Sequence, residues 1–203
     1  MNEMKEYKLD FKNHMGAWFI DEKLCDRILN YFYENPQIHQ PGMSYFTESD
    51  DWSQAVVKPN KNIKDSVEIL IPYNYFGKPF DEYRMNLQKV LNNYVERYNY
   101  LASMSPINVN ENYILQTYPK GGGFKTWHCE NSSPHLCKRV LAFETFLNDV
   151  PDGGTMFRDQ DITVPAKKGL TLIWPAGYTH VHKGQITEKH EKQIITGWLA
   201  YDG

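Results

Sequence analysis

The segment His128-Cys129-Glu130, together with the distant His182, decides how this chain folds. His128 and Glu130 are two residues apart, so on a β-strand their side chains project from the same face. His182, supplied by a separate strand, would add a second imidazole. Two imidazoles and one carboxylate are the set that holds non-haem Fe(II) on one side and leaves the other coordination positions open. The segment therefore predicts β-structure built around an open, catalytic metal site.

Further residues occur at regular distances on both sides of this set. Lys192 follows His182 by ten residues and Trp198 follows it by sixteen. Tyr118 precedes His128 by ten residues and is followed by the glycine run 121–123. Between the two halves lie an apolar run at 140–147 and a Gly-Gly-Thr-Met-Phe sequence at 153–157. Four separated elements thus appear in one order, which makes the pattern more specific than a His-x-Glu pair alone.

This order resembles that of the 2-oxoglutarate- and Fe(II)-dependent oxygenases, in their prolyl-4-hydroxylase-like branch. The likeness covers about residues 112–200. It implies a mainly β fold with flanking helices, in which a double-stranded β-helix (a jelly-roll or cupin-like core) is packed by two N-terminal helices. About eight short strands separated by Gly, Pro, Asn and Asp turns are expected after residue 106, among them 113–118, 124–130, 170–174 and 178–182. Such a series is typical of a sandwich or barrel.

The resemblance assigns three metal ligands: His128, Glu130 and His182. His180 lies two residues before His182 and could face the same way, but the spacing to the downstream basic residue and tryptophan selects His182. Most of the family has aspartate where this chain has Glu130. A carboxylate is still present, so the iron site is retained, and halogenation, which needs the carboxylate removed, is disfavoured.

Lys192 is the candidate for holding the distal carboxylate of 2-oxoglutarate. On a strand it shares a face with Thr196 and Trp198, and a buried lysine needs an anion. Other branches of the family have arginine here. Lysine offers a point charge in place of a bidentate fork, so accessory hydroxyl groups matter more. The resemblance places four further residues near the co-substrate: Tyr118, Thr196, Trp198 and, more weakly, Thr145.

The reaction implied is hydroxylation of an unactivated C–H bond, in a prolyl residue or a small molecule, coupled to decarboxylation of 2-oxoglutarate to succinate. It requires Fe(II), 2-oxoglutarate and O2, with ascorbate as a reductant that rescues stray oxidation. The protein would supply geometry, orientation and exclusion of water. The likeness is strongest around iron and co-substrate, so the substrate stays open between a peptide and a small molecule.

Three other interpretations compete with the oxygenase. A cupin-like metal-binding protein would use His180, His182 and Glu188, although the glutamate lies too far along the chain. A zinc hydrolase could use two histidines and a glutamate, but the helical His-Glu-x-x-His motif is missing from the sequence. A non-catalytic interaction module would have kept the barrel and lost the chemistry, which the intact ligand set disfavours.

Composition narrows the class of protein. The 203 residues are enough for one domain, with residues 1–105 as helical support and substrate loop and residues 106–203 as the β core. The net charge of -3 gives no general attraction to nucleic acid or acidic membranes. Three cysteines without regular spacing favour free thiols and a reducing compartment. With no apolar segment near Met1, we expect neither a secretory signal nor a membrane span, and a cytoplasmic protein.

The N-terminal half predicts two helices and a loop. The first helix begins after Asp21, a favourable N-cap, and ends at Pro36. The second carries an apolar stripe at helical spacing within residues 87–101. Between them, residues 37–64 are polar and rich in turn residues, and a loop of this length suggests either a substrate lid or a surface excursion held by its aromatic residues.

Overall fold

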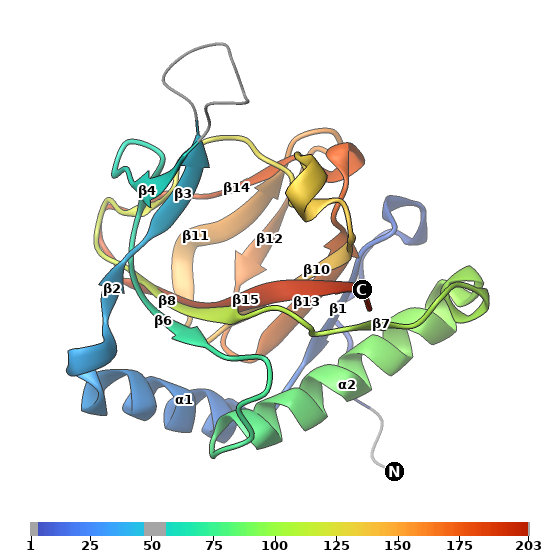
Figure 1. The fold of residues 1–203 in the computed structure, drawn as a ribbon, viewed down its shortest axis with the longest axis horizontal. Coiled ribbons are helices and arrows are strands. Elements are labelled where there is room, and N and C mark those ends of the chain that lie inside the picture. The colour runs from blue at the N-terminus through green and yellow to red at the C-terminus, as the bar shows by residue number, and fades with distance from the viewer. Residues whose placement is uncertain (1–3, 47–55, 203) are drawn as a thin grey trace.

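The computed structural model describes residues 4–46 and 56–202. Its largest sheet has eight antiparallel strands, and a three-stranded sheet lies against it (Figure 1). The large sheet runs in the order β1 (Gly16–Phe19), β13 (Leu170–Pro175), β10 (Arg139–Phe146), β15 (Lys192–Tyr201), β8 (Tyr113–Tyr118), β6 (Val67–Ile71) and β2 (Gln40–Pro41), with β7 (Ile107–Asn108) on β15. The small sheet consists of β12 (Ile162–Ala166), β11 (Val150–Phe157) and β14 (His182–Gly184). Two sheets facing one another confirm the predicted double-stranded β-helix class.

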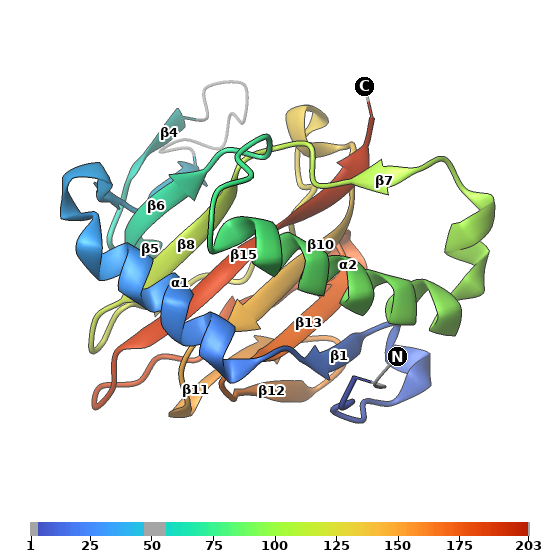
Figure 2. The same cartoon turned by 90° about the horizontal axis from the view of Figure 1, so that it is seen from below.

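Two helices cover the outer face of the large sheet (Figure 2). They are α1 (Glu22–Glu34) and α2 (Phe80–Arg97). The Asp21 side chain accepts a hydrogen bond from the backbone N–H of Lys23, which satisfies a free donor at the start of α1 as predicted. Both helices bury their apolar stripes in one cluster with the outward residues of the strands, including Phe143, Ile195 and Leu199. The helices thus make this face of the sheet a dry core.

The inner face of the same strands packs in a second cluster, between the two sheets. Because side chains alternate along a strand, β10 and β15 contribute to both clusters. Phe143 belongs to the outer cluster, whereas Phe146 and Ile194 belong to the inner one. The inner side also carries charged residues, Glu144 and Lys192, both buried. The polar residues between the sheets therefore mark the site.

The sequence-based expectations were wrong in three places. Residues 37–64 are not an irregular loop, because β3 (Met43–Phe46) and β4 (Val56–Pro59) pair with each other and β5 (Lys64–Asp65) pairs with β9 (Gly123–Phe124). Residues 47–55, part of the proposed lid, lie outside the described residues. The expected strand at 124–130 reduces to β9 and one isolated bridge between His128 and His182.

The expected strand at 178–182 is also different, because residues Tyr178–His180 form a 3-10 turn and β14 begins only at His182. All three cysteines are free, as expected: Cys25 is buried, Cys129 is partly buried and Cys137 is exposed. In the part of the chain that the structure describes, the helices are too short or too polar to traverse a lipid bilayer.

Candidate active site

Backbone hydrogen bonds fix the two segments that carry the expected ligands. The N–H of His128 donates to the carbonyl of His182 at 3.0 Å, and the N–H of His182 donates back at 2.9 Å. The N–H of Glu130 donates to the carbonyl of Ala176 at 2.9 Å. The ligand set is therefore held by main-chain contacts even though residues 125–130 form no regular strand.

The side chains of His128, Glu130 and His182 converge. Their ligand atoms lie within 4.8 Å of one another, the only such group of His, Cys, Asp or Glu among the described residues. Glu130 Oε1 lies 3.1 Å from His182 Nε2 and 3.4 Å from His128 Nε2. Neighbouring ligands of an octahedral ion with bonds of about 2.1 Å lie about 3.0 Å apart, so these spacings fit a metal ion of this size.

Both imidazoles are oriented by their second nitrogen. His128 Nδ1 lies 3.0 Å from the carbonyl oxygen of Thr126, and His182 Nδ1 lies 2.8 Å from that of His180. A carbonyl only accepts, so each Nδ1 carries a hydrogen, and each Nε2 faces Glu130. Nε2 is therefore the nitrogen that would bind a metal, once it has lost any proton that it donates to Glu130.

Glu130 and the two histidines shift one another's pKa values. Burial alone would raise the pKa of Glu130, but hydrogen bonds and attraction from the two histidines hold it well below the ordinary value. Burial and the neighbouring His182 lower the pKa of His128. Burial would also lower the pKa of His182, but its hydrogen bond to Glu130 raises it. The carboxylate is thus ionised, as a metal ligand must be.

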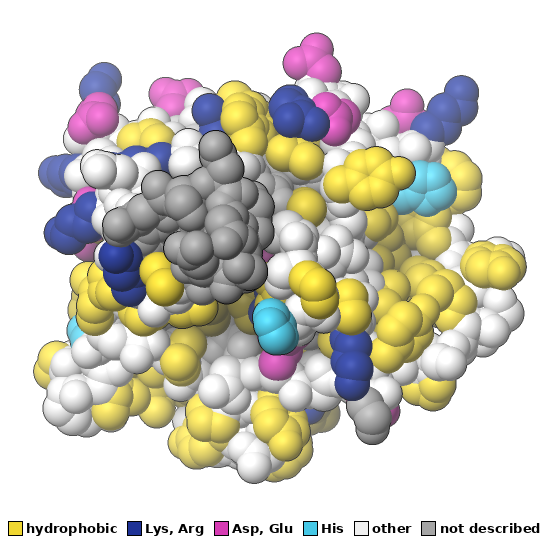
Figure 3. Space-filling model, turned by 45° about the horizontal axis from the view of Figure 1, so that its top comes forward, with side chains coloured by type: hydrophobic (Ala, Val, Ile, Leu, Met, Phe, Trp, Pro, Cys, Tyr) yellow, Lys and Arg dark blue, Asp and Glu magenta, His cyan; other side chains and the backbone are white. Residues whose placement is uncertain are grey.

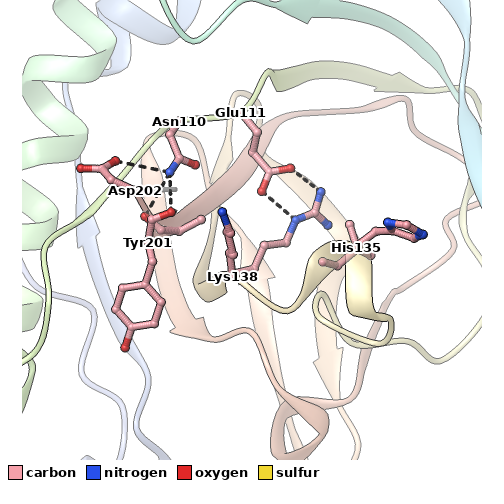
Figure 4. A pocket seen from close by; sticks show the side chains of 9 residues that line it. Asn110, Glu111, His135, Lys138, Tyr201 and Asp202 are labelled. Atoms are coloured by element: carbon pink, nitrogen blue, oxygen red, sulfur yellow. Dashed lines mark hydrogen bonds and ion pairs between the residues drawn. The ribbon is translucent and has the colours of Figure 1, made fainter.

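The second carboxylate oxygen of Glu130 is already occupied. Trp198 Nε1 donates to Glu130 Oε2 at 2.6 Å. Arg139 lies with its guanidinium 3.5 Å from the centre of the Trp198 ring and donates to the backbone carbonyl of Glu130 at 3.1 Å. Glu111 accepts two hydrogen bonds from the same guanidinium, at 2.8 and 2.6 Å. They are the dashed lines at Glu111 in Figure 4. Oε1, which faces the two imidazoles, is therefore the oxygen of Glu130 that is directed toward the ligand set.

Trp198, which was predicted to contact the co-substrate, lines the cavity and donates its indole N–H to a ligand carboxylate. Arg139 was not singled out from the sequence. Arg139 stands at the start of an apolar strand, and nothing in the local sequence marks it as a site residue. Its contacts with Glu111, Glu130 and Trp198 form only when the chain folds.

A cavity of about 920 Å³ contains the three ligands. Phe124 stacks on His128 with ring centres 3.7 Å apart, and Trp174 meets His182 edge-on at 5.0 Å. The rest of the wall mixes apolar and polar side chains, with Trp127, Val181 and Ile194 among the former. Aromatic rings thus flank both histidine ligands on the cavity wall.

Lys192 lies deep in this cavity, with 3% of its surface exposed. Its Nζ donates to the carbonyl of Gln185 at a long 3.4 Å and lies 5.1 Å from the centre of the Tyr118 ring. Burial lowers its pKa, and Glu144 opposes that effect. An ammonium group with one weak acceptor, aimed into a cavity, can still bind an anion.

The other predicted co-substrate contacts divide between the two faces of the sheet. Tyr118 and Thr196 line the cavity. Thr145 does not: its hydroxyl lies on the outer face, 2.9 Å from the Tyr83 hydroxyl on α2 and 2.8 Å from that of Thr171. The period of two along β10 points it away from the site. Sequence analysis also missed Glu144, the inward neighbour of Thr145.

His180, the competing distal ligand, is held elsewhere. Its Nε2 lies 2.8 Å from the carbonyl oxygen of Asn13 and its Nδ1 lies 2.9 Å from the Thr179 hydroxyl. Both ring nitrogens are therefore used outside the metal set, and the alternative cupin-like arrangement with Glu188 does not form.

A smaller pocket of about 370 Å³ adjoins the main cavity (Figure 4). The two share His135, Leu136 and Arg139. On the face drawn in Figure 3, basic and acidic side chains are interspersed with hydrophobic ones. That mixed charge differs from the continuous basic patch typical of nucleic-acid binding.

No family model and no curated protein matches this sequence. Solved structures do. A Pseudomonas putida prolyl-4-hydroxylase matches with a TM-score of 0.67 and 13% identity over 94% of each chain. A prolyl hydroxylase from Trichoplax adhaerens, in complex with a hypoxia-inducible factor peptide fragment, matches with a TM-score of 0.69 and 14% identity over 93% of this chain and 84% of that one.

A viral collagen prolyl hydroxylase from Paramecium bursaria Chlorella virus-1, in its 2-oxoglutarate complex, matches with a TM-score of 0.62 and 14% identity over 93% of this chain and 97% of that one. At such identities the likeness establishes the fold. The resemblance seen in the sequence motifs is therefore confirmed at the level of architecture, along nearly the whole chain.

Proposed function

We propose that this chain is an Fe(II)- and 2-oxoglutarate-dependent dioxygenase that hydroxylates a C–H bond of its substrate. The observation that carries the proposal is one cavity holding two oriented imidazoles, one ionised carboxylate and a buried lysine, whose one hydrogen bond among the described residues is a long one to a backbone carbonyl. A zinc hydrolase would use the first three groups but leave Lys192 unexplained. An oxygenase that binds a keto dicarboxylic acid uses all four.

Each side chain has a defined task in this reaction. His128, Glu130 and His182 would hold Fe(II) from one side, and Trp198 would keep the second oxygen of Glu130 from binding it. When bound, the iron supplies the oxidative chemistry that couples decarboxylation of 2-oxoglutarate to C–H hydroxylation. Lys192 would fix the distal carboxylate of the co-substrate, so that its keto acid end reaches the open side of the metal set.

The adjoining pockets favour a peptide over a small molecule as substrate. A chain-like molecule with one residue in the main cavity can extend over His135 and Leu136 into the smaller pocket. One of the related structures contains a bound peptide. We therefore propose a prolyl residue within a peptide as the first substrate to test, by comparing succinate release with proline-containing peptides and with free proline.

The proposed function is tested by anaerobic titration of Fe(II) and then 2-oxoglutarate into the metal-free protein. We expect a visible charge-transfer band from the chelated keto acid. The band should be lost in His182→Ala and weakened in Lys192→Ala. Two exposed residues of the same segment provide matched controls, His190→Ala and Lys189→Ala, which should both keep it. If the wild-type protein binds iron tightly and gives no band, the oxygenase proposal is wrong.

A further inference from the structure

Glu144 is a second buried carboxylate in this cavity, and the roles proposed above for the metal set and for Lys192 give it no task. On β10 it lies opposite Thr196 of β15 and Leu172 of β13, with its side chain directed between the two sheets. It is 8% exposed. A buried carboxylate is costly unless its oxygens are bound, so its place in an otherwise largely apolar wall needs a reason.

Its hydrogen-bond partner comes from the opposite sheet. The Thr155 hydroxyl on β11 donates to Glu144 Oε1 at 2.6 Å. This bond fixes the carboxyl group inside the cavity and leaves Oε2 facing its remaining neighbours. The charged groups that influence the pKa of Glu144 are Lys192 on β15, His182 on β14 and Glu130.

Glu144 and Lys192 act on each other. Burial raises the pKa of Glu144, and Lys192 is the strongest influence against that rise. Burial lowers the pKa of Lys192, and Glu144 is the influence against that fall. Lys192 has its single recorded hydrogen bond among the described residues with the Gln185 carbonyl. Both side chains line the same cavity, and each is the opposite charge that acts most strongly on the other.

A dianionic co-substrate would have to share this lysine. With Fe(II), ionised Glu130, Lys192 and a 2-oxo acid carrying two negative charges, the buried charges sum to zero. An ionised Glu144 adds one negative charge in a medium of low dielectric, where repulsion extends over several Å. A 2-oxo acid with one negative charge would restore the balance.

From this we infer that Glu144 is a specificity-determining residue. It shares the charge of Lys192 with the distal carboxylate of the co-substrate, and so weakens the preference of this cavity for a dianionic over a monoanionic 2-oxo acid. The inference rests on the proposed function and concerns the affinity of the co-substrate, not the identity of the iron ligands.

The test compares two ligands that differ only in distal charge. 2-Oxoglutarate and 2-oxopentanoate have the same chain length, but the second ends in a methyl group. The dissociation constant of each is measured anaerobically with the Fe(II)-loaded protein, from the charge-transfer band. Wild type is compared with Glu144→Gln, which keeps size and removes charge, and with Glu188→Gln as a control at an exposed carboxylate.

We expect Glu144→Gln to bind 2-oxoglutarate at least about tenfold more tightly, as removal of a nearby buried charge predicts, and 2-oxopentanoate about equally. Glu188→Gln should change neither. The inference is overturned if the dissociation constant of 2-oxopentanoate divided by that of 2-oxoglutarate is unchanged or lower in Glu144→Gln than in wild type. A lower ratio would indicate that Glu144 donates a proton to the distal carboxylate.

Two further outcomes are distinguished from a change in the two dissociation constants. If Glu144→Gln does not fold, as a thermal melt would reveal, Glu144→Met undergoes the same comparison, because it also keeps length and removes the charge. If wild type binds iron but neither acid gives a band, the proposed function itself is contradicted, independently of Glu144.

Discussion

The two faces of the large sheet use the same strands for opposite purposes. On β10, Phe143 and Thr145 face the helices, and Glu144 and Phe146 face the small sheet. On the helix side, the Thr145 hydroxyl is satisfied by its neighbours. On the inner side, Lys192 has one long hydrogen bond and Glu144 accepts one. The face with incompletely satisfied charges is the one built to bind something.

The largest expected effect comes from the helix side. Phe143 is fully buried against the helices, so Phe143→Ala should lower the free energy of unfolding by about 3–5 kcal/mol, measured by chemical denaturation. Iron affinity per folded molecule should stay as in wild type. A variant that kept its stability but lost iron would mean that the two faces are not separable.

A smaller loss of stability is expected at Thr145. Thr145→Val removes a hydroxyl bonded to Tyr83 and Thr171 and leaves those groups with one partner fewer, at a cost of about 1–3 kcal/mol in unfolding free energy. Because the hydroxyl faces α2, the dissociation constant for 2-oxoglutarate should not change. Weaker co-substrate binding without loss of stability would return Thr145 to the site.

On the inner face, a change at Trp198 should lower iron affinity and leave stability nearly unchanged. Trp198→Phe removes the N–H that occupies Glu130 Oε2 and keeps an aromatic ring beside Arg139, so iron affinity should fall about tenfold. The unfolding free energy should change by less than about 1 kcal/mol, since the residue is only partly buried. Metal titration followed by a competing chelator gives the affinity. Unchanged affinity would contradict a positioning role for the indole.

The smallest expected effect is on the reactivity of the Cys25 thiol, which is buried on the helix side of the sheet. Burial raises the pKa of the Cys25 thiol from 9.0 to about 12, so the unreactive protonated form persists well above neutral pH. At pH 8, a thiol reagent should label the exposed Cys137 and leave Cys25 unmodified until the protein unfolds. Mass spectrometry of the digested protein measures both sites. Rapid labelling of Cys25 in the folded protein would show that α1 opens locally.

Several parts of this architecture followed from local sequence. Asp21 and Pro36 bracket the first helix because capping and loss of a backbone donor act within one turn. Strands such as β8 and β13 were found from their runs of apolar and β-branched residues. The segment 124–130 was expected to be a strand and is not one. Its two ligands are held by backbone hydrogen bonds to distant residues and need no continuous strand.

Within the site, the sequence predicted the three candidate ligands and misplaced or missed residues whose position depends on the face of a strand. His128, Glu130 and His182 were identified from residue types and sequence distances, and they converge. Thr145 was placed on the wrong face, since the choice between alternate residues on β10 depends on which layer covers each side. The inward Glu144 was missed for the same reason.

The sequence by itself therefore determined the class of fold, the limits of the first helix and the identity of the three candidate ligands, because these follow from residue types, periodicity and the family-like spacing along the chain. Only the tertiary structure decided that Trp198 binds Oε2 of Glu130, that Arg139 binds the Glu130 carbonyl, and that Glu144 lines the same cavity as Lys192. Those contacts join strands far apart in sequence, and no local pattern records such a meeting.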